Sequence, residues 1–116
     1  MKKMAHIQTV QRMLYMEKDK THIVYILECN DGSLYTGYTN DLPNRIAMHE
    51  SGKGAKYTRG RGPFILRSTD SFLTKEEAMR HEYLIKQWSR VRKLAYIEDK
   101  EAKALERKGD RDGTTK

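Results

Sequence analysis

The feature that most constrains this chain is a pair of short apolar stretches joined by a tight turn, within residues 23–38. The first stretch, 23–27, reads Ile-Val-Tyr-Ile-Leu. A continuous run of β-branched and aromatic residues is typical of a strand buried on both faces. The second stretch begins at Ser33, directly after Asp31-Gly32, a dipeptide that favours a hairpin turn. The sequence therefore predicts an antiparallel hairpin at the centre of the fold.

The length of the turn decides which side chains share a face of this hairpin. With a three-residue loop, Gly32 adopts the left-handed conformation, Leu27 pairs with Tyr35, and Tyr25 pairs with Gly37. The two tyrosines then lie on one face, about 7–8 Å apart, and the glycine leaves space beside the Tyr25 phenol. A two-residue loop would place them on opposite faces, because a shift of one residue inverts the pattern. We expect the three-residue loop.

The composition indicates one small domain with a strongly polar surface. The chain has 116 residues, of which 37% are hydrophobic and 34% charged, with a net charge of +7. A basic balance of this size favours a polyanionic partner. One cysteine, Cys29, excludes an internal disulfide and is expected to be a buried apolar residue. No stretch reaches membrane-spanning length and no signal peptide is evident, so the expected location is the cytoplasm.

A first helix is predicted after the hairpin. The segment 39–41 supplies capping residues, Pro43 suits a first turn, and Gly52 ends the helix after about Ser51. One face of this helix, about 100° wide, holds apolar and polar residues together: Leu42, Arg45, Ile46 and His49. Arg45 and His49 therefore point toward the core margin, either as ordinary boundary residues or toward a group that needs charge.

The next segment, 52–63, contains four glycines, four cations and one tyrosine. Glycines let backbone amides approach phosphate and cations neutralise it, whereas the alternative is a solvated loop. Tyr57 favours the binding interpretation, because an aromatic residue in a basic loop often stacks.

A third strand is expected from Phe64 to Phe72, and a capping box at Thr74 predicts a helix from Lys75. We expect this helix to continue through the basic residues 90–93, with a last turn near 97. Its apolar arc is predicted to contain Ala78, His81, Leu84, Ile85 and Trp88. Glu82 lies at one edge of that arc, where it is either a salt-bridge partner of Lys86 or a metal ligand.

The residues Val24-Tyr25-Ile26 and Tyr35-Thr36-Gly37, ten residues from tyrosine to tyrosine, resemble the paired signature of the GIY-YIG nuclease superfamily. Valine and threonine replace two residues of the signature, whereas both tyrosines and the second glycine are present. Arg45, His49 and Glu82 follow in the order found in that family. The likeness covers residues 22–97, and the segment 52–63 is similar to the small stand-alone bacterial branch.

The resemblance implies a mixed fold of helices and strands, α/β in the broad sense and α+β in the narrow one. Its core would be a three-stranded antiparallel sheet flanked by helices. Its catalytic residues would be Tyr25, Tyr35, Arg45 and His49, with Glu82 binding one Mg²⁺ or Mn²⁺ ion. Arg45 would hold the phosphate, and one tyrosine would act as general base toward water. A phenol has a pKa near ~10, so that tyrosine needs help from its neighbours. The sequence leaves open which tyrosine it is, with Tyr35 slightly favoured.

The function implied is metal-dependent hydrolysis of phosphodiester bonds in nucleic acid. DNA is favoured over RNA, and a structure-selective or repair-linked endonuclease is the expected type. Binding residues are expected in the basic loop and around the end of the last long helix: Lys53, Lys56, Tyr57, Arg59, Arg61, Lys86, Arg90, Arg92 and Lys93. The alternative is a binding module without catalysis, because the asparagine that many relatives carry after the glutamate is missing here.

Three regions follow from these observations. Residues 1–21 are interpreted as an N-terminal extension, either disordered or the result of a start codon placed too early. Residues 22–97 form the predicted domain, and residues 98–116 are expected to be a charged tail of frayed helix followed by disorder. A catalytic domain this small has no separate DNA-binding domain, so a partner protein could supply specificity.

Overall fold

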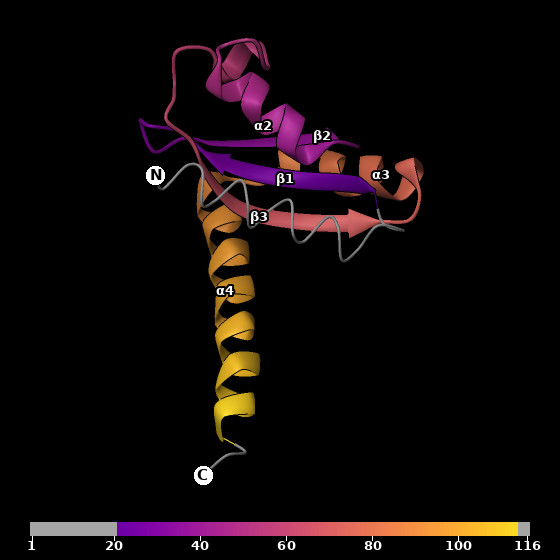
Figure 1. Cartoon of the computed structure of the whole chain (residues 1–116), viewed down its shortest axis with the longest axis vertical. Helices are drawn as coiled ribbons and strands as arrows, with labels where there is room; N and C mark the ends of the chain where they lie inside the picture. Colours follow the sequence, from indigo (N-terminus) through magenta and orange to yellow (C-terminus); the bar gives the residue numbers. More distant parts are fainter. Residues whose placement is uncertain (1–20, 114–116) are drawn as a thin grey trace.

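The computed structural model describes residues 21–113, so the expectation for the N-terminal extension lies outside the described residues except at Thr21. The described chain forms three strands, one short 3-10 helix and three α-helices (Figure 1). In chain order these are β1 His22–Glu28, β2 Leu34–Thr39, α2 Leu42–Glu50, η1 Lys56–Thr58, β3 Ile65–Phe72, α3 Lys75–Lys86 and α4 Arg90–Gly113.

The strands form one antiparallel sheet in the order β2-β1-β3, which confirms the predicted three-stranded sheet. Strand β1 is central and its residues 23–27 are all buried, because a partner strand flanks each edge and helices cover both faces. The predicted register is also confirmed. Leu27 pairs with Tyr35 and Tyr25 pairs with Gly37, while Gly32 has a φ of 85° in the three-residue turn.

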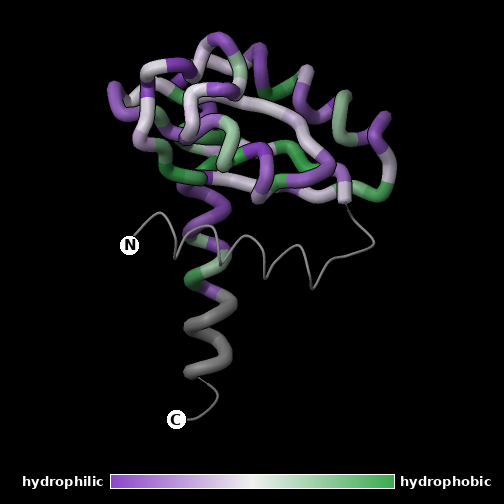
Figure 2. The backbone as a smooth tube through the Cα atoms, turned by 45° about the horizontal axis from the view of Figure 1, so that its top comes forward, coloured by the Kyte–Doolittle hydropathy of each residue, from purple (hydrophilic) through white to green (hydrophobic). Residues whose placement is uncertain are grey.

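The two faces of the sheet bury separate apolar clusters. Side chains of β1 alternate, so Ile23, Tyr25 and Leu27 pack with α2 residues on one face. Val24 and Ile26 pack on the other face, against α3 and α4. Figure 1 shows α2 on one side of the sheet and α4 leaving from the other, and Figure 2 shows hydrophobic positions gathered around the sheet. The sheet thus separates an α2 face from an α3/α4 face.

Helix α2 begins and ends at the residues that its capping signals predict. The Asp41 side chain accepts a hydrogen bond from the Asn44 backbone N–H at 3.4 Å, and Pro43 lies in the first turn. Ser51 is the C-cap, and Gly52 follows with a φ of 82°. Leu42, Ile46 and His49 are its buried residues, in agreement with the predicted face.

The last helical region differs from the prediction of one helix followed by a disordered tail. Helix α3 ends at Lys86, and α4 is a separate helix of 24 residues that continues to Gly113. Ser89 is the N-cap of α4, since its side chain accepts a hydrogen bond from the Arg92 backbone N–H at 3.2 Å. The break contains neither glycine nor proline, which is why the pattern of helix-forming residues did not reveal it.

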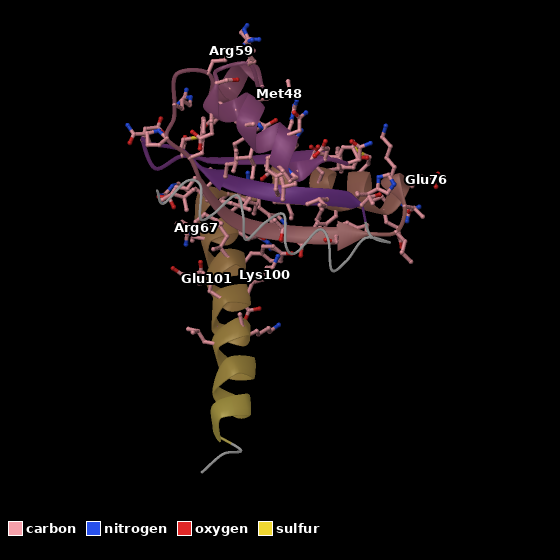
Figure 3. All side chains as sticks on the ribbon, in the orientation of Figure 1. Met48, Arg59, Arg67, Glu76, Lys100 and Glu101 are labelled. Carbon is pink, nitrogen blue, oxygen red and sulfur yellow. The ribbon has the colours of Figure 1, made fainter. Side chains whose placement is uncertain are left out.

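Helix α4 is attached to β3 by a group of polar side chains. Lys100 Nζ donates to Ser68 Oγ at 2.8 Å, to the Thr69 carbonyl at 2.7 Å and to Asp70 Oδ1 at 2.8 Å. His81 and Tyr96 donate to the other oxygen of Asp70. Figure 3 places Lys100 and Glu101 beside Arg67 where α4 crosses β3, and Arg67 Nη2 lies 3.5 Å from a Glu101 carboxylate oxygen.

Two further expectations concern single features. Cys29 is buried, as predicted for an apolar residue. None of the helices described between residues 21 and 113 combines the length and the apolar character that a bilayer crossing requires.

Candidate active site

The candidate site is centred on the side chain of Tyr25, which is fully buried at 0% exposure. Its ring lies across Gly37, on the neighbouring strand. A Cβ atom at Gly37 would stand 2.5 Å from the Tyr25 hydroxyl oxygen and 2.9 Å from a ring carbon of Tyr35. The glycine therefore makes the space in which the phenol lies, as the register predicted.

A chain of three hydrogen bonds fixes the protons around Tyr25. The Thr58 hydroxyl donates to the Ala55 carbonyl at 2.8 Å, so its oxygen is left to accept from His49 Nδ1, also at 2.8 Å. His49 then carries its proton on Nδ1. Its Nε2 is the acceptor for the Tyr25 hydroxyl, at 2.8 Å. The phenol of Tyr25 thus points its proton at an imidazole nitrogen that is able to take it.

Burial keeps both partners of this bond neutral. It raises the pKa of Tyr25 to about 12, with hydrogen bonding to Arg45 opposing the rise and the neighbouring Tyr35 adding to it. Burial, assisted by the charge of Arg45, lowers the pKa of His49 to about 4. At neutral pH the pair is therefore a phenol and an unprotonated imidazole, which agrees with the hydrogen-bond chain.

Arg45 lies beside this pair on α2, one turn before His49. The neighbouring Tyr25 hydroxyl is the main reason that the pKa of Arg45 is raised, with a smaller contribution from Tyr35. Among the described residues its buried Nε has no hydrogen-bond partner. A buried donor without a partner costs free energy, so the guanidinium retains capacity for an anionic ligand.

Tyr35 and Tyr57 extend this centre toward the surface. The Tyr35 ring lies 6.2 Å from that of Tyr25, 5.4 Å from that of His49 and 6.0 Å from that of Tyr57. Tyr35 and Tyr57 are stacked, with an interplanar angle of 23°. The guanidinium carbon of Arg61 lies 4.5 Å from the centre of the Tyr57 ring. The structure therefore brings four predicted binding or catalytic residues into one row: Tyr25, Tyr35, Tyr57 and Arg61.

Glu82 lies on α3 and is buried, with 8% of its surface exposed. The predicted apolar arc was wrong at Leu84, which is 52% exposed, because the helix turns Ala78, Glu82 and Ile85 inward instead. Lys86 Nζ lies 3.3 Å from a Glu82 oxygen, so the expected salt bridge is present.

This donor set suits a hard divalent ion that is bound by one carboxylate. Within the part of the chain that the structure describes, no three or more His, Cys, Asp or Glu side chains form a cluster able to hold a metal. Zinc requires several protein ligands, whereas Mg²⁺ keeps most of its waters and takes phosphate oxygens as ligands. A single buried carboxylate, that of Glu82, fits the latter.

The other predicted binding residues fall into two groups. Lys53, Lys56 and Arg59 are exposed on the loop after α2, and Figure 3 shows Arg59 at its outer tip. The residues at the start of α4 have contacts within the protein. Arg90 donates to the Gly32 carbonyl at 3.1 Å, and the Arg92 guanidinium lies 4.5 Å from the centre of the Trp88 ring.

Lys93 differs from the expectation of a surface cation. It is buried, and burial together with the charge of Lys86 lowers its pKa. A lysine that faces the protein interior cannot follow a phosphate backbone across the surface, so only Arg90 and Arg92 of this cluster are exposed.

Sequence reasoning missed Thr58, which is buried and sets the proton position on His49. No sequence pattern marks it, and only the structure shows that Gly54, four residues earlier, leaves no room for a Cβ against His49. The loop glycines thus allow close packing on the histidine. A hollow of about 540 Å³ lies elsewhere, on the outer side of α3 near Met79 and Tyr83, and it contains none of the site residues.

Comparisons with known proteins show which family the chain resembles. The profile of the GIY-YIG catalytic domain matches residues 21–95. A UPF0213 protein of Oceanobacillus iheyensis is 60% identical over 83 residues, which covers 72% of this chain and 96% of that protein. A UPF0213 protein of Halalkalibacterium halodurans is 67% identical over 72 residues, covering 62% and 77%. The NMR structure of protein EF2693 from E. faecalis has a TM-score of 0.52 and 40% identity, covering 72% and 88%.

Proposed function

Because the chain belongs to the GIY-YIG catalytic domain family, we propose that it hydrolyses phosphodiester bonds in nucleic acid with the aid of one divalent ion held by Glu82. The observation that carries this proposal is the hydrogen-bond chain from Tyr25 through His49 and Thr58 to the Ala55 carbonyl. A phenol that is hydrogen-bonded to an unprotonated imidazole can relay a proton taken from water.

This series of hydrogen bonds favours Tyr25 over Tyr35 as the group that takes the proton from water. As water gives its proton to the Tyr25 oxygen, the phenol passes its own proton to His49 Nε2. No free phenolate has to form in this concerted transfer, and the imidazole, with its pKa of about 4, holds the proton only transiently. The resulting hydroxide attacks phosphorus and the leaving oxygen departs from the opposite side.

Arg45 and Glu82 would provide the groups that neutralise the negative charge of the phosphate. The Arg45 guanidinium, with its unpartnered buried Nε, would hold a phosphate oxygen. Glu82, released from Lys86, would hold Mg²⁺ or Mn²⁺. When bound, such an ion stabilises charge on the scissile phosphate and on the leaving oxygen. Lys86 would then be available to a neighbouring phosphate.

The basic residues would position the polymer. Lys53, Lys56 and Arg59 on the loop, with Arg61, lie on the α2 face, and Arg61 forms a 2.5 Å ion pair with Asp31 in the β1–β2 turn. Arg90 reaches the same turn from α4. DNA is the favoured substrate, and a structure-selective endonuclease acting in the cytoplasm is the finer form of the proposal. A partner protein would supply specificity beyond these contacts.

The Glu82–Lys86 ion pair favours a second candidate, a nucleic-acid-binding module without catalysis. In that case Lys86 permanently neutralises the carboxylate, and the missing downstream asparagine has no consequence.

Metal-dependent cleavage distinguishes the two candidates. Wild-type protein, Glu82→Gln, Tyr25→Phe and Tyr35→Phe would be incubated with Mg²⁺ or Mn²⁺ and with duplex, single-stranded and branched DNA or RNA. We expect Glu82→Gln to abolish cleavage and Tyr25→Phe to reduce it by about 10²–10⁴-fold. Tyr35→Phe should be milder. Glu76→Gln, an exposed position on the same helix, is the matched control. Binding without cleavage, unchanged in Glu82→Gln, would support the binding module instead.

A further inference from the structure

Tyr57 and Arg61 form an outward extension of the candidate active site. The Tyr57 ring is stacked on Tyr35 at 6.0 Å and carries the Arg61 guanidinium 4.5 Å from its centre. Tyr57 is 45% exposed, whereas Tyr25 at the inner end is fully buried. The four side chains therefore run in a row from the reacting centre to solvent: Tyr25, Tyr35, Tyr57 and Arg61.

The backbone holds this row in place. The Asn30 N–H donates to the Arg61 carbonyl at 2.7 Å, and the Arg61 N–H donates to the Thr58 carbonyl at 3.1 Å. Thr58, next to Tyr57, is buried and accepts a hydrogen bond from His49. Gly60 supplies a φ of 73°, which favours glycine. The loop position of Tyr57 is thus fixed by the same contacts that orient His49.

An exposed aromatic ring with a guanidinium on it is a surface on which a nucleobase stacks. In a continuous duplex the neighbouring pairs already cover the faces of each base, so only an unpaired base can use such a surface. Cations of the same loop, Lys56 and Arg59, are exposed and able to accompany the strand.

We propose that Tyr57 and Arg61 bind an unpaired base next to the scissile phosphate, so that the preferred substrate is single-stranded or locally unpaired nucleic acid rather than continuous duplex. This inference rests on the proposed nuclease function and specifies its substrate class. The base would stack against the Tyr57–Arg61 surface while the phosphate on one side of that nucleotide reaches Arg45. Tyr57 is a binding residue in this scheme and takes no part in proton transfer.

Binding measured without divalent metal separates this inference from catalysis. Fluorescence anisotropy would give the Kd of fluorescein-labelled single strands, of the matched duplex, and of a duplex with one unpaired nucleotide. We expect the single strand and the unpaired site to bind at least about tenfold more tightly than the duplex. A difference of this size is what one stacked base contributes to affinity. Tyr57→Leu should remove that preference, because it should weaken binding of the single strand and of the unpaired site more than binding of the duplex. Tyr57→Phe, which keeps the ring, is the matched control.

A second readout reports stacking itself. A 2-aminopurine base at the unpaired position should be quenched by wild-type protein and by Tyr57→Phe, but not by Tyr57→Leu. Equal binding of single strand and duplex, or equal loss of both in Tyr57→Leu, would overturn the stacking site. The cleavage test with Glu82→Gln would still decide the nuclease proposal independently. No binding of any nucleic acid by the wild type would overturn both proposals.

Discussion

At the scale of single residues, His49 connects the parts of the candidate site. It lies on α2, accepts from Tyr25 on β1 and donates to Thr58 in the following loop. Three segments that are separate in sequence therefore meet at one imidazole. Each of its nitrogens has a partner, so the ring has one orientation and one proton position.

The low pKa of His49 predicts a pH dependence of stability. Its pKa falls from 6.5, the ordinary value expected in the unfolded chain, to about 4 in the folded protein. Between these values the unfolded chain binds more protons, so this contribution to stability is complete above about pH 6.5 and is lost as the pH falls toward 4. Urea unfolding of wild type should therefore give a lower free energy of unfolding at pH 4.5 than at pH 7.

The control for this pH effect is His49→Gln, whose amide does not titrate. It should lose some stability at both pH values, about 1–3 kcal/mol, through weaker hydrogen bonds to Tyr25 and Thr58. The part of the pH dependence that His49 contributes should disappear. A variant with the same pH dependence as wild type would show that another group is responsible.

At the scale of elements, the attachment of α4 to β3 depends on one polar group. Lys100 makes three hydrogen bonds to β3, and the Asp70 carboxylate also accepts hydrogen bonds from His81 and Tyr96. These hydrogen bonds to Lys100 keep the pKa of Asp70 low despite its burial. The contacts lie on the α3/α4 face and do not touch Tyr25.

Removal of Lys100 should therefore weaken the fold more than the loss of an ordinary surface lysine. Lys100→Met leaves an Asp70 oxygen and the Thr69 carbonyl without this donor, at a cost of about 1–3 kcal/mol. Lys103→Met is the matched control, because the Lys103 side chain is 64% exposed and, among the described residues, pairs with Asp99 on its own helix. Its effect should stay below about 0.5 kcal/mol. Chemical denaturation of both variants provides the comparison, and equal effects would contradict the assigned role.

Elements with local signals could be predicted from the sequence, and those decided by tertiary contacts could not. The turn at Asp31-Gly32 determined the register that places Tyr25 opposite Gly37. By contrast, the break between α3 and α4 comes from packing of Trp88 against Tyr96, with ring centres 5.2 Å apart, and from the Ser89 cap. Nothing in the spacing of apolar residues requires a helix to end there.

The candidate site shows the same division. Spacing predicted which faces hold Tyr25, Tyr35, Arg45 and His49, because each lies on a regular element with a fixed periodicity, whereas their proposed roles came from the resemblance to the GIY-YIG family. Thr58 was missed because it lies in an irregular loop, where position depends on contacts rather than on a repeat. Lys93 was misjudged for a related reason: its inward direction depends on the helix break before it.

At the scale of the whole molecule, the charge distribution decides how a polyanion is held. The net charge is +7, and the exposed cations of the loop lie on the α2 face with Tyr57. Helix α4 carries both signs, as its Lys103–Asp99 pair illustrates. Long-range attraction should therefore direct nucleic acid to the α2 face.

This arrangement predicts a salt dependence that differs between the two regions. For single-stranded DNA, log affinity should fall linearly with log salt, with a slope of about −0.7 for each phosphate contacted. Arg59→Ala should reduce the steepness by about one such contact, whereas Lys103→Ala should leave it unchanged. Anisotropy titrations at several salt concentrations measure both slopes. An equal change in the two variants would mean that binding is not confined to the α2 face.

The direction in which α4 leaves the sheet has a practical consequence. Its distal half extends from the face opposite to the Tyr25 centre (Figure 1). A dye, a surface linker or a second protein domain joined beyond this helix would be held at a distance from the α2 face. Immobilised in this way, the protein would still present its tyrosine row to a long polymer passing through solution.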